Sequence, residues 1–342
     1  METVIGKIKT KRIVTNEDTY DIQTKNKNFF ANDVLVHNSE IILRPYQFCN
    51  LTEVIVRSDD TIKDIQEKIK VATILGTIQS SLTYFPYLRK IWKKNTEEER
   101  LLGVSLTGIY DNNLLNDHND PELSRRLEKF REIAVETNKE WAEKLGVAQS
   151  TSITCVKPSG TISELCDTAS GIHPRHSEYY IRRIRADNKD PVTEFLKLNN
   201  VPNEPDVTKP ASTTVFSFVK KAPKGAKLRD EITSIDHLNL WLTYQRYWCE
   251  HKPSVTISVK ESDWPAVGAW VWDHFDEMTG VSFLPYDGGT YRQAPYESIT
   301  KEQYDELVTK IPDKIDWTLL QEHDDLTEGV QNLACVAGGC TL

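Results

Sequence analysis

The sequence of 342 residues has no apolar run that approaches the ~20 residues of a membrane-spanning helix. Its first residues are polar and lack the apolar core of a secretory signal peptide. A basic excess is also missing: 42 Lys and Arg stand against 51 Asp and Glu, for a formal net charge of −9. Broad non-specific binding to nucleic acid needs a basic face, so this balance argues against it. We therefore expect a cytoplasmic protein with neither a membrane nor a nucleic acid as partner.

Cysteine is scarce, and the close Cys-x-x-Cys pair expected of a stand-alone thiol oxidoreductase is absent. In a reducing compartment the six cysteines should not form structural disulfides, and most should be small buried side chains. Cys335 and Cys340 differ because they lie in the last eight residues and are separated by Val-Ala-Gly-Gly, so they can close a disulfide. A zinc site would need two further ligands, and only His323 is near, so we predict no metal site. Tail cysteines without a function remain the alternative.

The composition changes near residue 38. Residues 1–38 contain short β-like stretches, among them TYDIQT and DVLVHN, whereas long helices alternate with short strands from residue 39 onward. Residues 254–259, a helix near 263–278 and residues 280–285 form a strand–helix–strand pattern. Such a pattern implies a parallel sheet.

The clearest helix is predicted between Asp120 and Gly146. Asp120 suits its cap, Pro121 its first turn and Gly146 its end. Its apolar residues fall largely on one face: Leu123, Leu127, Phe130, Ala134, Trp141 and Leu145.

Three consecutive residues, His37-Asn38-Ser39, have the chemistry of self-cleavage. The Asn38 amide can attack its own carbonyl to form a succinimide, while His37 polarises that carbonyl and protonates the leaving amine. Ser39 supplies a hydroxyl nucleophile for acyl transfer. The tripeptide alone is a weak signal, but residues 19–39, TYDIQTKNKNFFANDVLVHNS, resemble the C-terminal splicing region of inteins throughout, including a Phe-Phe-Ala-Asn turn.

The intein resemblance implies a role for each of these residues. Residues 1–38 would be the C-terminal half of a split intein, and the N-terminal half would be on another chain. His37 would assist, Asn38 would cyclise and Ser39 would be the branch-point nucleophile, with Asp21 helping branch resolution. The alternative is an ordinary β-rich extension.

Residues 39–54, SEIILRPYQFCNLTEV, resemble the active-site loop of adenosylcobalamin-dependent (class II) ribonucleotide reductases. The family pattern is Asn-x-Cys-x-Glu with a second Cys nine residues after the Glu, and Glu40 and Cys49 have this spacing. Val36 and Asn38 stand where the Asn and the first Cys belong. Splicing an upstream segment that ends in Asn-x-Cys onto Ser39 would restore the pattern.

Three later stretches extend the resemblance: residues 100–111, 154–186 and 282–299. In the second, PSGTIS precedes a helical run whose first backbone N–H groups can bind phosphate. The candidate substrate-phosphate residues are Ser159, Gly160, Thr161 and Ser163. A plain helix cap is the alternative. Polar residues that follow could suggest a metal or nucleic-acid site, but we interpret them as structural groups behind the loop; they are His173, Arg175, His176, Arg182, Arg183 and Arg185. In the third stretch, the Gly288-Gly289 turn could face the cofactor.

The reductase resemblance implies an α/β fold. Residues 39–320 would form half of a ten-stranded α/β barrel, preceded by a short all-β intein fragment of the Hint type in residues 1–38. Residues 321–342 would be a flexible redox-active tail, which from residue 321 to Cys340 spans roughly 65 Å if fully extended.

The resemblance also implies a mechanism. Adenosylcobalamin would supply a radical, and a cysteine thiyl radical would abstract the 3′-hydrogen of a ribonucleotide, expected to be a triphosphate. Glu40 would be the general base on the 3′-hydroxyl, and Cys49 would be half of the dithiol that reduces the 2′-carbon. Cys335 and Cys340 would re-reduce that dithiol with electrons from a thioredoxin-like donor. A non-catalytic nucleotide-binding or interaction protein is the competing interpretation, and it would not need these residues together.

Overall fold

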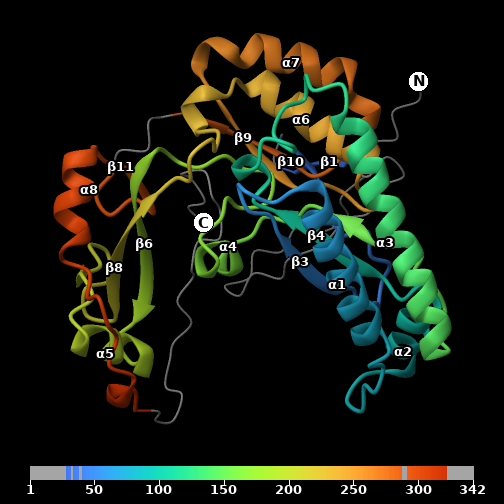
Figure 1. Cartoon of the computed structure of the whole chain (residues 1–342), viewed down its shortest axis with the longest axis horizontal. Coiled ribbons are helices and arrows are strands. Elements are labelled where there is room, and N and C mark those ends of the chain that lie inside the picture. The colour runs from blue at the N-terminus through green and yellow to red at the C-terminus, as the bar shows by residue number, and fades with distance from the viewer. Residues whose placement is uncertain (1–27, 32–33, 38–40, 287–290, 322–342) are drawn as a thin grey trace.

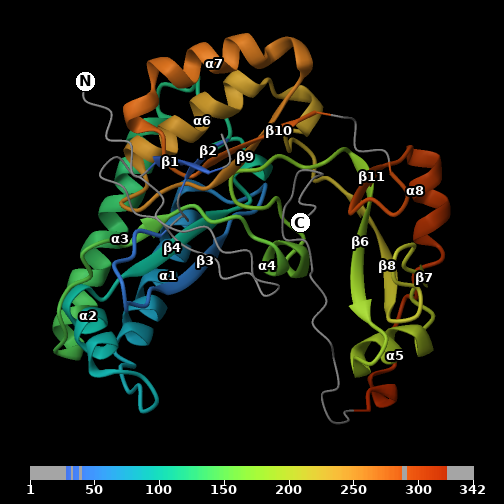
Figure 2. The ribbon, with the colours of Figure 1, turned by 180° about the vertical axis from the view of Figure 1, so that it is seen from behind.

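The computed structural model describes residues 28–31, 34–37, 41–286 and 291–321. Several predicted functional residues lie outside this part of the chain: Asp21, Asn38, Ser39, Glu40, Gly288, Gly289, His323, Cys335 and Cys340. The described part has two arms joined at the top, as seen in Figure 1 and, from behind, in Figure 2. Within it, no helix combines the length and apolarity that a bilayer crossing requires.

One arm is built on parallel strands. β3 (Asn50–Ile55), β4 (Leu102–Thr107) and β5 (Thr154–Cys155) form a parallel sheet in the order β3-β4-β5. β9 (Val255–Val259) and β10 (Val281–Pro285) form a parallel pair, with Val281 opposite Val255. A parallel bridge between Val156 and Pro253 connects the two. The predicted strand–helix–strand pattern with parallel strands is therefore confirmed.

Helices cover this parallel arrangement. α1 (Ile62–Ser80) and α3 (Leu123–Leu145) pack on one another beside β3 and β4, and α6 (Ser234–Tyr247) and α7 (Trp264–Asp273) lie over β9 and β10 (Figure 1). α2 (Lys90–Glu99) lies at the lower end of the same arm. All six residues of β4 are buried, as expected for a parallel strand covered on both faces. The described residues also include short 3₁₀ turns: Ile109–Asp111, Arg229–Glu231, Glu261–Asp263, Phe275–Glu277 and Trp317–Leu319.

The predicted helix between Asp120 and Gly146 is confirmed as α3, with a later start. Asp120 does not cap the helix. It lies in the turn before α3, where its carboxylate accepts the Glu122 N–H at 2.9 Å and forms an ion pair with Arg126 of α3. Gly146 ends the helix in the left-handed conformation, with φ of +65°. The buried face continues through Thr137, Asn138 and Ala142, whereas Leu145 is exposed.

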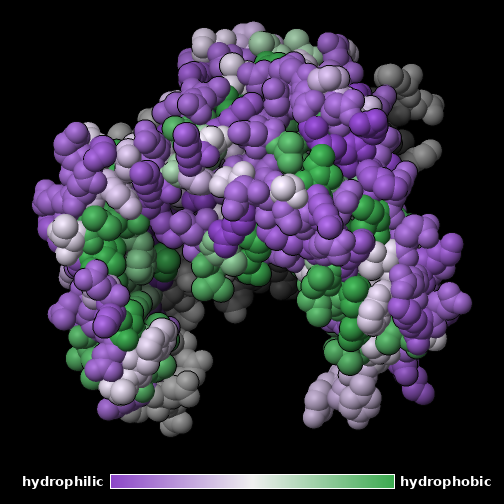
Figure 3. All heavy atoms as spheres, in the orientation of Figure 1, coloured by the Kyte–Doolittle hydropathy of each residue, from purple (hydrophilic) through white to green (hydrophobic). Residues whose placement is uncertain are grey.

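The second arm is an antiparallel sheet that the sequence analysis did not predict. Its strands lie in the order β11 (Tyr296–Ser298), β6 (Tyr179–Asp187), β8 (Thr213–Lys221) and β7 (Asn203–Pro205). α5 (Pro191–Leu198) and α8 (Lys301–Val308) belong to this arm (Figure 1). Figure 3 shows a hollow between the two arms.

The described part of the amino-terminal region is a hairpin. β1 (Asn28–Ala31) pairs antiparallel with β2 (Val34–His37), with Asn28 opposite His37. The strand predicted in DVLVHN is confirmed over Val34–His37. The turn predicted at Phe-Phe-Ala-Asn is wrong for Phe29, Phe30 and Ala31, which are strand residues paired with β2.

Candidate active site

The segment that follows β5 lies over the carboxyl ends of the parallel strands. It includes α4 (Thr161–Leu165), which lies under the junction of the two arms in Figure 1. The Gly108 N–H, just after β4, donates to the Ala169 carbonyl at 2.8 Å, and the Gly171 N–H donates to Thr107 Oγ1 at 2.6 Å. The carboxyl edge of a parallel sheet is where α/β proteins place their ligands.

The two predicted phosphate-site serines are buried and bonded to each other. The Ser163 N–H donates to Ser159 Oγ at 2.9 Å, and the Ser163 hydroxyl donates to the Ser159 carbonyl at 2.5 Å. The Ser159 N–H donates to Ser170 Oγ at 2.9 Å. These bonds hold the turn in front of Gly160, which is the residue before α4. The serine side chains thus shape the turn, and the backbone at the start of α4 is left as the candidate contact with phosphate.

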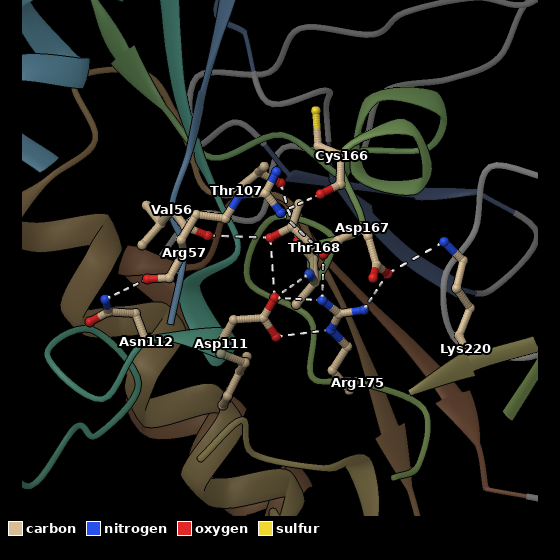
Figure 4. Close-up of polar contacts among 12 residues, drawn as sticks. Val56, Arg57, Thr107, Asp111, Asn112, Cys166, Asp167, Thr168, Arg175 and Lys220 are labelled. Atoms are coloured by element: carbon tan, nitrogen blue, oxygen red, sulfur yellow. Dashed lines mark hydrogen bonds and ion pairs between the residues drawn. The ribbon is translucent and has the colours of Figure 1, made fainter. Parts of the chain in front are cut away.

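A buried ion pair fixes this segment to the sheet, and Figure 4 shows it. Arg175 Nε donates to Asp111 Oδ1 at 2.9 Å, and a terminal nitrogen of Arg175 donates to Asp111 Oδ2 at 2.8 Å. Both side chains are 3% exposed. The same Asp111 carboxylate accepts the Ala169 N–H at 2.8 Å and the Thr168 hydroxyl at 3.2 Å. Four donors therefore converge on the carboxylate of Asp111, which ends the 3₁₀ turn Ile109–Asp111 that comes after β4.

Further polar groups surround the Asp111–Arg175 pair and form one cluster with it (Figure 4). Arg175 also donates to the Asp167 carbonyl at 2.8 Å, and the Asp167 carboxylate lies 3.4 Å from Lys220 Nζ of β8. Burial by itself lowers the pKa of Arg175, but the hydrogen bonds and charge of Asp111 more than offset this, so its pKa is raised above the ordinary value. Arg57, after β3, donates to the Cys166 carbonyl. The cluster thus joins β3, β4 and the antiparallel arm around one segment.

Arg175, His173 and the three arginines of β6 have structural partners, as the sequence analysis interpreted them, whereas His176 stacks on Tyr296 and its Nδ1 is buried without a hydrogen-bond partner among the described residues. Each arginine of β6 pairs with an acidic side chain: Arg182 with Glu164, Arg183 with Glu297 and Arg185 with Asp206. His173 is buried and accepts the Thr256 N–H at 3.0 Å. Within the described residues, no group of three or more His, Cys, Asp or Glu side chains is placed to hold a metal ion.

Cys49 lies at the opposite, amino-terminal end of β3, where the preceding loop is firmly held. His251 Nδ1 accepts the Ile42 N–H at 3.3 Å, while its Nε2 contacts the Leu102 carbonyl at 2.7 Å. Gly103 of β4 leaves room for Ile41 of this loop and for Leu51 of β3, because a Cβ there would lie 3.0 Å from Ile41 and 2.3 Å from Leu51. The structure therefore orders the chain on both sides of Cys49, whereas Glu40 lies outside the described residues.

Comparison with known proteins identifies the kind of fold. No protein-family model matches the chain. It is 28% identical over 303 residues to the adenosylcobalamin-dependent ribonucleoside-triphosphate reductase of Euglena gracilis. This match covers 87% of the present chain and 40% of the Euglena protein. It is 27% identical over 334 residues to the reductase of the same name from Lactobacillus leichmannii, covering 89% and 44%. The crystal structure of a B-12 dependent (class II) ribonucleotide reductase superposes with a TM-score of 0.68 at 24% identity, over 84% of this chain and 43% of that one.

The chain is homologous to class II ribonucleotide reductases. The resemblance inferred from residues 39–342 is thereby confirmed at the level of homology and α/β fold. The chain spans about two-fifths of the length of the reductases that it matches. The intein resemblance of residues 1–38, the ten-stranded barrel and the roles of individual site residues stay predictions.

Two groups that shape this candidate site were missed by sequence reasoning. Asp111 ends the stretch RLLGVSLTGIYD, which carried part of the resemblance, so a signal was present without a role attached to it. His251 had no signal, because its partners Ile42 and Leu102 are far from it in sequence.

Proposed function

We propose that this chain, once joined to an upstream partner by trans-splicing, forms the C-terminal part of a ribonucleotide reductase that converts ribonucleoside triphosphates to deoxyribonucleotides. The observation that carries the proposal is similarity to named triphosphate reductases over 87% of the chain. The Glu40–Cys49 spacing adds a local motif to this similarity. Because the chain spans only two-fifths of these relatives, it should have no reductase activity alone.

The proposed chemistry assigns one task to each predicted side chain. Glu40 takes the proton of the 3′-hydroxyl as general base. Cys49 and a cysteine of the partner give two electrons and two protons to the substrate, the 2′-hydroxyl leaves as water and the two thiols become a disulfide. Cys335 and Cys340 then reduce that disulfide by thiol exchange and are recharged by a thioredoxin-like donor.

The triphosphate of the substrate is proposed to lie at the start of α4. The buried Ser159 and Ser163 hold the turn, so the backbone at Gly160 and Thr161 makes the contact. The Asp111–Arg175 pair keeps this segment at the carboxyl edge of the sheet.

Adenosylcobalamin is the proposed cofactor of the completed enzyme, as the names of the relatives indicate. When bound, it supplies the radical that starts the reaction. Ile162 and Leu165 of α4 are exposed, and Figure 3 shows apolar side chains in the region of α4 beside the hollow. These two exposed apolar side chains would contribute to the surface that holds the cofactor.

Trans-splicing is proposed to generate the complete active-site loop. Asn38 cyclises with help from His37, Ser39 carries the branch ester and Asp21 assists its resolution. The hairpin of β1 and β2 ends at His37, directly before the proposed cleavage site.

The test mixes this chain with the upstream reductase polypeptide of the same organism. Intact mass should show a ligated product and a released fragment that ends at Asn38, and Ser39→Ala should prevent ligation. The ligated product should then reduce ribonucleoside triphosphates only with adenosylcobalamin. A ligated product without this activity would refute the reductase proposal.

Variants of the ligated enzyme separate the proposed roles. Glu40→Gln should lower turnover by about 10²–10⁴-fold. Cys335→Ser with Cys340→Ser should keep a single turnover from pre-reduced enzyme but lose turnover driven by thioredoxin. Cys166→Ser is the matched control, since it removes a thiol that has no proposed part in the relay. Normal thioredoxin-driven turnover in the tail variant would remove Cys335 and Cys340 from the mechanism.

A further inference from the structure

α4 is too short to keep its own orientation. It contains five residues, and a helix of fewer than about 12 residues needs tertiary contacts to be stable in water. Apolar packing supplies little of this support, because Ile162 is 42% exposed and Leu165 is 83% exposed. On the inner side of the helix, the buried Ser163 bonds to Ser159. The polar groups of α4 therefore decide how the helix lies.

Glu164 connects α4 to the antiparallel arm. Its Oε1 accepts two hydrogen bonds, from Arg182 Nε of β6 at 3.2 Å and from the Tyr296 hydroxyl of β11 at 3.2 Å. The Arg182 guanidinium also lies over the Tyr296 ring, 4.5 Å from its centroid. Burial raises the pKa of Tyr296, so its hydroxyl keeps the proton that it donates. One carboxylate oxygen of α4 thus receives donors from two paired strands.

Both donors are held in place by the sheet around them. Tyr296 and Arg182 stand directly opposite each other in the antiparallel pair of β11 and β6, so their side chains share one face. His176 stacks on the Tyr296 ring, with centroids 5.4 Å apart. Arg182 also donates to the Arg183 carbonyl at 3.1 Å. Because these contacts fix the two donors, the donors set the place of Glu164 and do not follow it.

The parallel arm holds the same helix at its end. Arg57, after β3, donates to the Cys166 carbonyl and, at 3.3 Å, to the Asp167 carbonyl, and both of these residues follow α4 (Figure 4). α4 lies between the two arms in Figures 1 and 2. Arg57 therefore fixes the end of the helix, whereas Glu164 fixes its side against the antiparallel arm.

We propose that Glu164 is a positioning residue, which fixes the direction of α4 and so keeps the backbone at Gly160 and Thr161 in place for the substrate phosphates. Glu164 acts through α4 and not by contact with the substrate. The inference rests on the proposed phosphate contact at the start of α4, and it adds that the antiparallel arm supports this contact. Loss of the Glu164 bonds weakens phosphate binding equally in the ground state and in the transition state. Such a uniform loss raises KM and leaves kcat unchanged.

The experiment uses the ligated enzyme with adenosylcobalamin. Glu164→Gln keeps the size of the side chain and removes the charge that strengthens both hydrogen bonds. KM for cytidine triphosphate should rise about tenfold, while kcat should stay within about twofold of the parent. Calorimetry with inorganic tripolyphosphate, which carries neither ribose nor base, should show Kd rising by the same factor. Tyr296→Phe removes one of the two bonds and keeps the ring, so both rises should be smaller, about threefold.

A matched control separates this contact from general damage to the arm. Glu297→Gln makes the same change one residue further along β11, where the carboxylate pairs with Arg183 at 2.6 Å. Arg183 adjoins Arg182 on β6 and is equally buried, with 11% of each side chain exposed. Successive residues of a strand point to opposite faces, so the Arg183–Glu297 pair lies on the face away from α4. KM, kcat and tripolyphosphate affinity should therefore stay at the parent values.

Three results would overturn the positioning role: unchanged KM and tripolyphosphate affinity in Glu164→Gln, a fall in kcat at unchanged KM, or an equal rise of KM in Glu297→Gln. The reductase proposal is judged separately, on the ligated parent. An active parent with no effect of Glu164→Gln keeps the reductase function and refutes the positioning role. An inactive parent whose tripolyphosphate affinity falls in Glu164→Gln refutes the reductase function and keeps the positioning role.

Discussion

The two arms differ in where their charged side chains lie. In the parallel arm, β4 is buried along its whole length and the charged Asp111 follows only where the strand ends. In the antiparallel arm, β6 carries Arg182, Arg183 and Arg185 within the strand, each mostly buried, with 11–21% of the side chain exposed, and paired with a carboxylate. Parallel strands are covered on both faces, whereas antiparallel strands can keep one face near water. The Asp111–Arg175 pair, with both side chains 3% exposed, should therefore matter much more than the Arg183–Glu297 pair of the antiparallel sheet, whose carboxylate is 50% exposed.

The largest effect is expected from Asp111→Asn. The change keeps side-chain volume but leaves the buried Arg175 guanidinium without its main counter-charge, and breaking such a pair costs about 3–5 kcal/mol. Asp167 also contacts Arg175, at 3.2 Å, so we expect a loss near 3 kcal/mol. Denaturant unfolding measures it, and hydrogen exchange should show a faster Ala169 amide, because that N–H donates to Asp111. A loss below about 1 kcal/mol would mean that the pair does not hold the segment.

Stability should also fall in acid. Burial lowers the pKa of His173 from 6.5 to about 4. The unfolded chain therefore binds more protons between these values, so the free energy of unfolding falls as the pH drops from about 6.5 to about 4, by up to about 3 kcal/mol for this group. His176 shifts in the same direction, also through burial first.

Unfolding at pH 7, 6, 5 and 4 tests this, with His173→Gln as the comparison. Glutamine does not titrate, so the variant should lose less stability than the parent between pH 7 and pH 4, even if it is less stable at pH 7. If the free energy of unfolding fell equally with pH in the two proteins, His173 would not be held neutral by burial.

Gly103→Ala should have an intermediate effect. A methyl group there would meet the terminal methyl groups of Leu51 at 2.3 Å and of Ile41 at 3.0 Å. Overpacking costs about 1–3 kcal/mol, and because Leu51 is 41% exposed and can shift, we expect a cost at the lower end of that range. Gly268 of α7 is the control, because nothing lies within 4 Å of its Cβ position. Gly268→Ala should stabilise the helix by about 0.5–1 kcal/mol. The two variants should shift the thermal midpoint in opposite directions, and shifts of the same sign would contradict the close approach of Leu51 and Ile41 to Gly103.

The difference between the parallel and the antiparallel arm also explains which parts of the fold could be predicted from the sequence. Val255–Val259, α7 and Val281–Pro285 were predictable because apolar runs separated by a helix leave a local signal. The antiparallel sheet was not, because β6 pairs with β8 and β11 over long separations and its arginines obscure the apolar alternation. In the site, Ser159 and Ser163 were singled out from a local turn pattern, and the structure shows them holding that turn, while their part in phosphate binding stays a prediction. The Asp111–Arg175 pair required knowledge of which strand ends meet, 64 residues apart in sequence.

The smallest effect is expected from Glu297→Gln in the antiparallel arm. Arg183 lies 2.6 Å from Glu297, a shorter separation than the 2.8 Å between Arg175 and Asp111, so distance alone would predict the stronger contact here. Glu297 is half exposed, however, and water solvates its charge whether or not the pair forms. Pairs of this kind contribute about 0–1 kcal/mol and weaken with salt. Denaturant unfolding of Glu297→Gln and Asp111→Asn at low and at high salt compares the two arms directly. Glu297→Gln should cost less than 1 kcal/mol, with a smaller cost at high salt, whereas the cost of Asp111→Asn should change little. Equal losses in the two variants would show that burial does not distinguish the arms.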